Sequence, residues 1–176
     1  MSFAVLADGR QLHFREAGSG QALVLLHGWS MSSAVFQEVM QRLSGDYRVL
    51  APDLAGHGES DPDSPGFSHD SLAADIEEWL SQLGIESIAL LGWSLGGQVA
   101  LKLVQRERIG IKKLVLVATT PLFIARDDWS NGLPATQVRA MDRQVQRDYR
   151  RSMSEFFSLM FEGEEIPRER YRSIVQ

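Results

Sequence analysis

Four short runs of almost uninterrupted apolar residues alternate along the chain with segments whose apolar residues recur at helical spacing. The apolar runs are residues 22–26, 47–51, 88–91 and 114–118. Their length and their lack of polar alternation are typical of strands that are buried on both faces of a sheet. The pattern therefore predicts four strands buried on both faces, of which 114–118 is the last.

Helices are predicted after the first three of these strands, because apolar residues recur every three or four positions over 35–43, 72–83 and 95–107. Ser32 or Ser33 is a candidate N-cap of the first helix, and Gly84 is a natural stop after the second. Strands that alternate with helices of this length imply right-handed crossovers and a mainly parallel sheet with helices on both faces. The predicted fold class is α/β.

Both ends of the chain depart from this alternation. Residues of alternating character around Asp8-Gly9 predict an N-terminal β-hairpin. From Pro121 onward no further buried strand is predicted, and residues 134–160 have a helical period. We therefore expect a core over 1–120 and a helical segment over 121–176. The apolar stripe of that segment consists of Val138, Met141, Val145, Tyr149, Met153, Phe156, Phe157 and Met160.

Composition and charge narrow the classes of function. The 176 residues include 18 Lys and Arg against 23 Asp and Glu, a net charge of −5, which disfavours nucleic acid and anionic membranes as partners. The chain has no cysteine, which excludes disulfides, thiolate zinc sites and a cysteine nucleophile. No apolar run approaches the roughly 18 residues needed to cross a bilayer, and the first residues do not resemble a signal peptide. We expect a cytoplasmic protein.

A Gly-Trp-Ser-Leu-Gly-Gly sequence at 92–97 lies between a predicted strand and a predicted helix. This is the context of a nucleophile elbow, in which a sharp turn holds a serine in a strained backbone conformation. Ser94 is the candidate nucleophile, and the N–H groups at the start of the following helix favour negative charge beside it. A purely structural glycine-rich turn is the competing interpretation.

A second motif, His27-Gly28-Trp29, follows the first buried strand. Acyl transfer needs two backbone N–H groups that hold the carbonyl oxygen as it becomes an oxyanion. One comes from the residue after the nucleophile and the other from an early strand-to-helix loop. These donors are predicted to be Leu95 and Trp29. We interpret His27 as a buried loop organiser rather than as a catalytic base.

A third motif, at 52–60, contains Asp53 and His57, which could be taken for a charge-relay pair. Both residues precede Ser94, whereas the acid and the histidine follow the nucleophile in a fold with this type of elbow. We therefore interpret this loop as structural. All the histidines of the chain precede Ser94: His13, His27, His57 and His69.

The three motifs, in this order and spacing, resemble the α/β-hydrolase superfamily over residues 3–120. The tryptophan of the second motif, the elbow and residues 118–129 further resemble the BioH family of pimeloyl-acyl-carrier-protein methyl ester esterases of biotin synthesis. This resemblance implies a serine carboxylesterase without metal or cofactor, and a helical lid that begins near residue 121. It also implies that the triad Asp and His follow the lid. We therefore expect the chain to be the N-terminal two-thirds of such an enzyme, truncated within the lid and inactive alone.

The same resemblance gives roles to residues of the helical segment. Arginines spaced along one helix face would dock an acidic acyl carrier protein: Arg139, Arg143, Arg147, Arg150 and Arg151. A solvated face, partly neutralised by acidic neighbours, explains this stripe equally well. The channel that binds the acyl chain of the substrate would be lined by Phe156, Phe157, Leu159 and Met160. The alternative role of these side chains is packing of the lid.

Three functions remain open at this stage. The first is hydrolysis of the methyl ester of pimeloyl-acyl-carrier protein, and the second is hydrolysis of another small ester, a lactone or a thioester by the same fold. The third is binding of an acyl ligand or a partner without turnover, which the absence of any histidine after Ser94 favours. We also expect self-association, because the outer edge of strand 114–118 would have no neighbouring strand.

Overall fold

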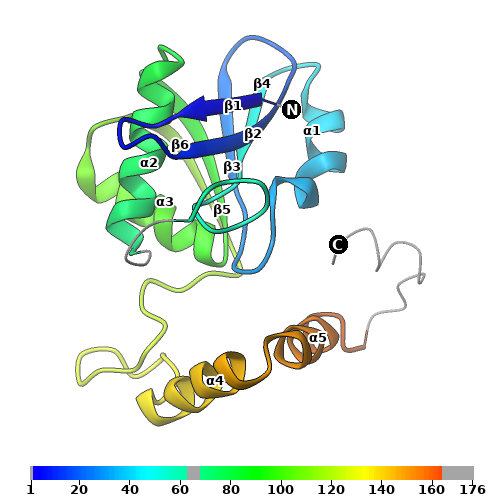
Figure 1. Ribbon diagram of the computed structural model, residues 1–176. Helices are drawn as coiled ribbons and strands as arrows, with labels where there is room; N and C mark the ends of the chain where they lie inside the picture. Colours follow the sequence, from blue (N-terminus) through cyan, green and yellow to red (C-terminus); the bar gives the residue numbers. More distant parts are fainter. Residues whose placement is uncertain (1, 63–67, 164–176) are drawn as a thin grey trace. The chain divides into compact units, whose positions relative to one another are not determined.

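The computed structural model describes residues 2–62 and 68–163, and the chain divides into two compact units, 1–119 and 120–176. The first unit contains a six-stranded sheet with the strand order β1-β2-β4-β3-β5-β6 (Figure 1). β3 (Ala22–Leu26), β4 (Arg48–Pro52), β5 (Ser87–Trp93) and β6 (Gly110–Val117) run parallel to one another. The mainly parallel sheet is therefore confirmed.

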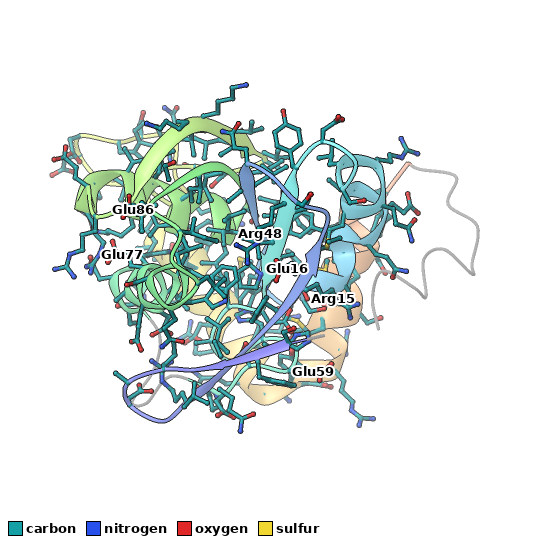
Figure 2. All side chains as sticks on the ribbon, turned by 90° about the horizontal axis from the view of Figure 1, so that it is seen from above. Arg15, Glu16, Arg48, Glu59, Glu77 and Glu86 are labelled. Carbon is teal, nitrogen blue, oxygen red and sulfur yellow. The ribbon has the colours of Figure 1, made fainter. Side chains whose placement is uncertain are left out.

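The predicted N-terminal hairpin consists of β1 (Ser2–Val5) and β2 (Gln11–Ala17). Its turn is longer than the Asp-Gly pair alone suggested, because the N–H of Leu6 bonds to the C=O of Arg10 at 2.8 Å. The second strand of the hairpin pairs antiparallel with β4. Arg48 and Glu16 form an ion pair of 2.6 Å across this pairing, where Figure 2 shows the two side chains close together.

Helices cover both faces of the parallel strands, as predicted (Figure 1). On one face, Met40 of α1 (Gln37–Leu43) belongs to a small apolar cluster with residues of β3 and β4. On the other face, α2 (His69–Gln82) and α3 (Leu95–Arg106) contribute to a larger core around the fully buried Trp79. The side chains of β3 alternate between these two clusters, as expected for a strand buried on both faces.

Ser32 and Gly84 lie at helix ends as predicted, and the structure adds a cap that was not predicted. Ser32 caps the short 3₁₀ helix η1 (Ser33–Phe36) that precedes α1. Ser68 and Ser71 form a reciprocal capping box at the start of α2. Gly84 follows the C-cap of α2 with a φ of 67°, a left-handed conformation that glycine adopts without strain.

β6 differs from the prediction in both extent and burial. It begins at Gly110 rather than at residue 114, and its last four side chains are 38–49% exposed. Within the part of the chain that the structure describes, β6 pairs only with β5. The expectation that 114–118 is buried on both faces is therefore wrong, because its side chains are not fully covered by other elements of the described residues. The expected position of this strand at the edge of the sheet agrees with the strand order.

The described part of the second unit, residues 120–163, contains the helices α4 (Ala135–Arg147) and α5 (Tyr149–Met160). The continuous helical period predicted for 134–160 is wrong at Asp148, where φ is −149° and ψ is 83°. The Asp148 carboxylate accepts the N–H of Arg151 at 3.1 Å and so caps α5. None of the helices in the described residues has the length and apolarity to cross a membrane.

Candidate active site

Ser94 lies at the turn between β5 and α3, with a φ of 52° and a ψ of −113°. Its N–H donates to the C=O of Val117 at 2.9 Å, and its C=O accepts the N–H of Gly97 at 2.9 Å. A positive φ is unfavourable for a residue with a side chain and requires support from its surroundings. The backbone at Ser94 therefore has the strained conformation that a nucleophile elbow needs.

The glycines around Ser94 have no space for a side chain. A Cβ on Gly92 would overlap the backbone of Gly96, and a Cβ on Gly96 would overlap the carbonyl oxygen of Leu26. The start of α3 therefore approaches the end of β3 at backbone distance. This confirms that the elbow needs glycine at both positions.

The loop after β3 lies directly against Ser94, because a Cβ on Gly28 would be only 3.4 Å from the Ser94 Cβ. Trp29 follows in this loop and is partly buried against the core. Leu95 is the first residue of α3, so its N–H is one of the four that have no acceptor within the helix. The structure thus brings the loops of both predicted oxyanion donors to Ser94, while their role in holding an oxyanion stays a prediction.

His27 is fully buried, and both of its ring nitrogens are hydrogen-bonded. Nε2 accepts the N–H of Leu54 at 3.0 Å, so the proton is on Nδ1, which donates to the C=O of Gly28 at 2.8 Å. Burial lowers the pKa of His27 to about 4, against the opposing effect of the Gly28 carbonyl. These contacts support the interpretation of His27 as a buried loop organiser.

The burial of His27 predicts that the fold becomes less stable as the pH falls from 7 to 4. An unfolded histidine binds a proton near pH 6.5, whereas folded His27 does so only near pH 4. The unfolded chain thus binds more protons within this range, and the free energy of unfolding should fall by about 3 kcal/mol from pH 7 to pH 4. Urea denaturation at several pH values measures this slope. A His27→Gln variant with an equally steep slope would contradict the prediction.

Asp53 pairs with His13, to which the sequence analysis gave no role. Asp53 Oδ2 lies 2.7 Å from His13 Nδ1, and both side chains are almost fully buried. The carboxylate also accepts the N–H of Ser33 at 2.6 Å and that of Glu59 at 3.0 Å. Burial acts to raise the pKa of Asp53, but these N–H groups and His13 outweigh it, so the pKa is lowered. The structural interpretation of loop 52–60 is supported.

The remaining two histidines also have partners away from Ser94. His57 Nδ1 lies 3.0 Å from the C=O of Ala55, and the His57 ring lies 5.3 Å from that of His27. His69 Nε2 lies 2.9 Å from Oε1 of Gln98. The histidine that pairs with Asp53 is His13, which agrees with our rejection of Asp53 and His57 as a relay. The described residues contain no cluster of His, Asp and Glu that could hold a metal ion.

The five predicted docking arginines are exposed, but they do not lie on one helix. Arg139, Arg143 and Arg147 are spaced four residues apart on α4, whereas Arg150 and Arg151 lie on α5 beyond the break at residue 148. The expectation of a single stripe is therefore wrong. Arg151 also forms an ion pair of 2.8 Å with Glu155, as the solvated interpretation anticipated for part of the stripe.

The predicted acyl-binding residues all lie on α5 or at its end. The rings of Phe156 and Phe157 are 5.8 Å apart, and Leu159 is 68% exposed. Met160 is the last residue of the helix and is partly buried. These four side chains thus belong to the second compact unit, whereas Ser94 belongs to the first.

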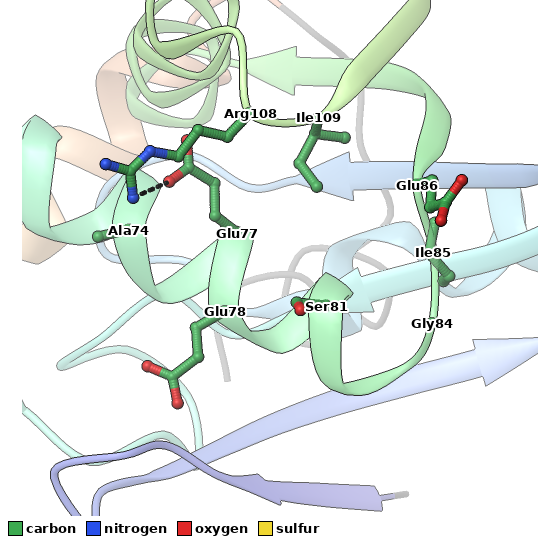
Figure 3. Close-up of a pocket in the computed structure, with 9 residues that line it drawn as sticks. All are labelled: Ala74, Glu77, Glu78, Ser81, Gly84, Ile85, Glu86, Arg108 and Ile109. Atoms are coloured by element: carbon green, nitrogen blue, oxygen red, sulfur yellow. Dashed lines mark ion pairs between the residues drawn. The ribbon is translucent and has the colours of Figure 1, made fainter.

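One hollow in the described residues lies at the opposite end of β5 from Ser94. It has a volume of about 760 Å³ and lies before β5 and β6, beside Glu77, Glu78, Glu86 and Arg108 (Figure 3). Ser94 follows the carboxyl end of β5, so a strand length of about 20 Å separates the two places. Parallel sheets bind their ligands at the carboxyl ends of the strands, and we therefore locate the candidate site at Ser94 and not in this hollow.

Comparison with known proteins agrees with this geometry, since residues 21–172 match the alpha/beta hydrolase fold family. The pimeloyl-[acyl-carrier protein] methyl ester esterase of Nitrosomonas europaea is 38% identical over 88% of this chain and 59% of that protein. The same esterase of Nitrosospira multiformis is 33% identical over 86% of this chain and 59% of its own length. An esterase from Exiguobacterium antarcticum superposes with a TM-score of 0.91 at 30% identity, over 99% of this chain and 66% of that one. The chain spans about 59% of the length of the two methyl ester esterases. From its motifs, its sheet and these matches, the chain belongs to the α/β-hydrolase family.

Proposed function

We propose that Ser94 is the nucleophile of a carboxylic ester hydrolase whose substrate is the methyl ester of a pimeloyl group on acyl carrier protein. The observation that carries this proposal is the left-handed backbone conformation of Ser94 between β5 and α3. The loop at Gly28 lies close enough to contact this serine. The names of the methyl ester esterases at 33% and 38% identity support the substrate class. No metal or cofactor takes part in the proposed reaction.

The proposed reaction proceeds through an acyl-enzyme. Ser94 Oγ attacks the ester carbonyl carbon, and the N–H groups of Trp29 and Leu95 hold the resulting oxyanion. A base takes the Oγ proton and passes it to the departing methoxide, which leaves as methanol. Water then hydrolyses the acyl-enzyme and restores the serine. Each of the four histidines of this chain has a hydrogen-bond partner other than Ser94, and the proposal assigns the chain the nucleophile and the oxyanion donors but no base.

The apolar side chains of α5 provide a surface for the acyl chain. We propose that Phe156, Phe157, Leu159 and Met160 bind its methylene groups. The neighbouring rings of Phe156 and Phe157 and the 68% exposure of Leu159 give this helix an accessible apolar surface. A hydrolase for short esters, lactones or thioesters would not need this surface. A comparison of pimeloyl and acetyl methyl esters therefore distinguishes these functions.

The carrier protein is expected to dock on the arginines of α4. The double substitution Arg143→Glu and Arg147→Glu should weaken binding of pimeloyl-acyl-carrier protein about tenfold at low salt, because like charges would then face each other. Fluorescence anisotropy with labelled carrier protein measures this affinity. The difference from wild type should shrink as the salt concentration rises.

A double variant with the same change in charge serves as the control. Arg42→Glu and Lys112→Glu alter exposed residues of α1 and β6 and should leave the affinity close to that of the wild type. Equal weakening by both double variants would show that only net charge matters, and would contradict docking on α4.

Binding without turnover is the second candidate function. The observation that favours it is the position of all four histidines before Ser94 in the sequence, together with the hydrogen bond that each makes to a residue other than Ser94. This function predicts carrier-protein affinity in the absence of Ser94-dependent ester cleavage. The two candidates therefore separate when affinity and turnover are measured on the same sample.

The exposed edge strand predicts self-association of the chain. Unpaired N–H and C=O groups beside apolar side chains are a template for another strand, and Val115 in β6 is 49% exposed. A Val115→Lys substitution should therefore reduce the mass measured by static light scattering at a given concentration. Val104→Lys in α3, at a side chain that is 42% exposed, is the matched control and should have no effect. A wild-type monomer at all concentrations would contradict the prediction.

A further inference from the structure

Two residues next to each other in space adopt left-handed backbone conformations. Ser94 has a φ of 52°, and Ala118, directly after β6, has a φ of 44°. Such conformations are uncommon for residues with a Cβ and persist only where the surrounding structure holds them. The contacts between these two segments show what holds them.

Residues 117–119 hold both backbone polar groups of Ser94. The N–H of Ser94 donates to the C=O of Val117 at 2.9 Å, and the hydroxyl of Thr119 donates to the C=O of Ser94 at 2.7 Å. The left-handed turn at Ala118 separates these two contacts. This turn allows one short segment to bond the same serine from its backbone and from its side chain.

Thr119 is also fixed against the first turn of α3. A Cβ on Gly97 would lie 2.6 Å from Cβ, Cγ2 and Oγ1 of Thr119, so the threonine side chain fills the space over the Gly97 Cα. The C=O of Ser94 also accepts the N–H groups of Gly97 at 2.9 Å and Gln98 at 3.2 Å. The Thr119 hydroxyl is therefore a third donor to the carbonyl group at which α3 begins.

We infer that Thr119 is a positioning residue for Ser94: with the carbonyl of Val117, its hydroxyl holds the serine backbone in the conformation that presents Oγ. This inference rests on the proposed function, since it concerns the backbone of the proposed nucleophile. It also links the nucleophile to the carboxyl end of β6. Its direct consequence is that loss of one hydroxyl group loosens Ser94 without loosening the sheet.

Amide hydrogen exchange on the 176-residue chain tests this inference without any substrate. In Thr119→Val the Ser94 amide should exchange about tenfold faster, the effect expected for one hydrogen bond. The amide of Leu90, inside β5, serves as the reference for global opening and should keep its rate. Thr119→Ser retains the hydroxyl and should restore slow exchange at Ser94. Thr119→Ala, which removes the hydroxyl without adding a buried methyl group, should repeat the result of the valine variant.

Three results would overturn the role of Thr119. The first is unchanged exchange at Ser94 in both Thr119→Val and Thr119→Ala. The second is an equal acceleration at Leu90, which would indicate global destabilisation. The third is failure of both variants to fold while Thr119→Ser folds, which would show that the hydroxyl supports the whole domain rather than Ser94.

Reactivity provides a second measurement, which separates this inference from the proposed function. Imidazole-assisted reaction of Ser94 with a fluorophosphonate should have a maximal rate about tenfold lower in Thr119→Val, at an unchanged half-saturating probe concentration. A higher half-saturating concentration at an unchanged maximal rate would contradict positioning. If wild-type Ser94 does not react, the proposed function fails, while amide exchange still decides the role of Thr119.

Discussion

The 176-residue chain is expected to hydrolyse p-nitrophenyl acetate with a turnover far below the value of about 10 s⁻¹ that is typical of enzymes. No histidine follows Ser94 in this chain. The four histidines that precede it have hydrogen-bond partners at Asp53, Gly28, Ala55 and Gln98. Oxyanion stabilisation and binding alone retain roughly 10³ to 10⁴ over water when the base of a triad is absent. Spectrophotometric release of p-nitrophenol measures the rate.

Added imidazole and two serine variants test whether this hydrolysis depends on Ser94. Imidazole in solution should raise the rate by acting as the base, and this increase should be absent in Ser94→Ala. Ser30, which lies in the loop after β3, provides a control, since Ser30→Ala should retain the increase. A Ser94-dependent turnover near 10 s⁻¹ without imidazole would show that a residue of this chain, with His57 the first to test, supplies the base.

Asp53→Ala should lower the free energy of unfolding by about 3 to 5 kcal/mol, because it removes one member of a buried pair. His13 would lose its partner 2.7 Å away, and the N–H groups of Ser33 and Glu59 would lose their acceptor. Unsatisfied buried groups of this kind are costly to the folded state. Urea denaturation monitored by circular dichroism measures the loss.

Glu16→Ala is the matched control, since it removes a carboxylate that pairs with a basic side chain, but at a partly exposed position (Figure 2). Its expected loss is less than about 1 kcal/mol. The Asp53 contribution is complete above the ordinary aspartate pKa of 3.8 and disappears as the pH falls through the lowered pKa. The difference between wild type and Asp53→Ala should therefore narrow only below about pH 4. A loss for Asp53→Ala as small as that for Glu16→Ala would contradict the structural role of this carboxylate.

Much of the first unit was predictable because its signals are local. Buried parallel strands, helix caps and the glycines of the elbow each depend on a few neighbouring residues. Ser32 caps a helix, Gly84 ends one, and Gly96 lies where a side chain has no space, as predicted. The pairing of His13 with Asp53 was not predictable in this way. It follows from the antiparallel register of β2 and β4, in which Phe14 lies opposite Pro52, and no spacing along the chain encodes that register.

The errors also have physical reasons. The run at the end of β6 is apolar, but exposure depends on which elements cover a strand, and the sequence pattern alone does not contain that information. The period over 134–160 continues through Asp148, whose capping side chain ends one helical segment and begins another. No sequence pattern predicted the contact of Thr119 with Ser94, because the two residues are 25 positions apart along the chain.

The most direct test of the central claim is to locate the serine that reacts with a fluorophosphonate in the presence of imidazole, by mass spectrometry of the digested chain. The account predicts an adduct on Ser94, and no adduct at this rate in Ser94→Ala. This selectivity follows from its left-handed backbone and from the N–H groups expected to hold the phosphonyl oxygen. An adduct on another serine, or equal labelling of wild type and Ser94→Ala, would contradict the assignment of Ser94 as the nucleophile.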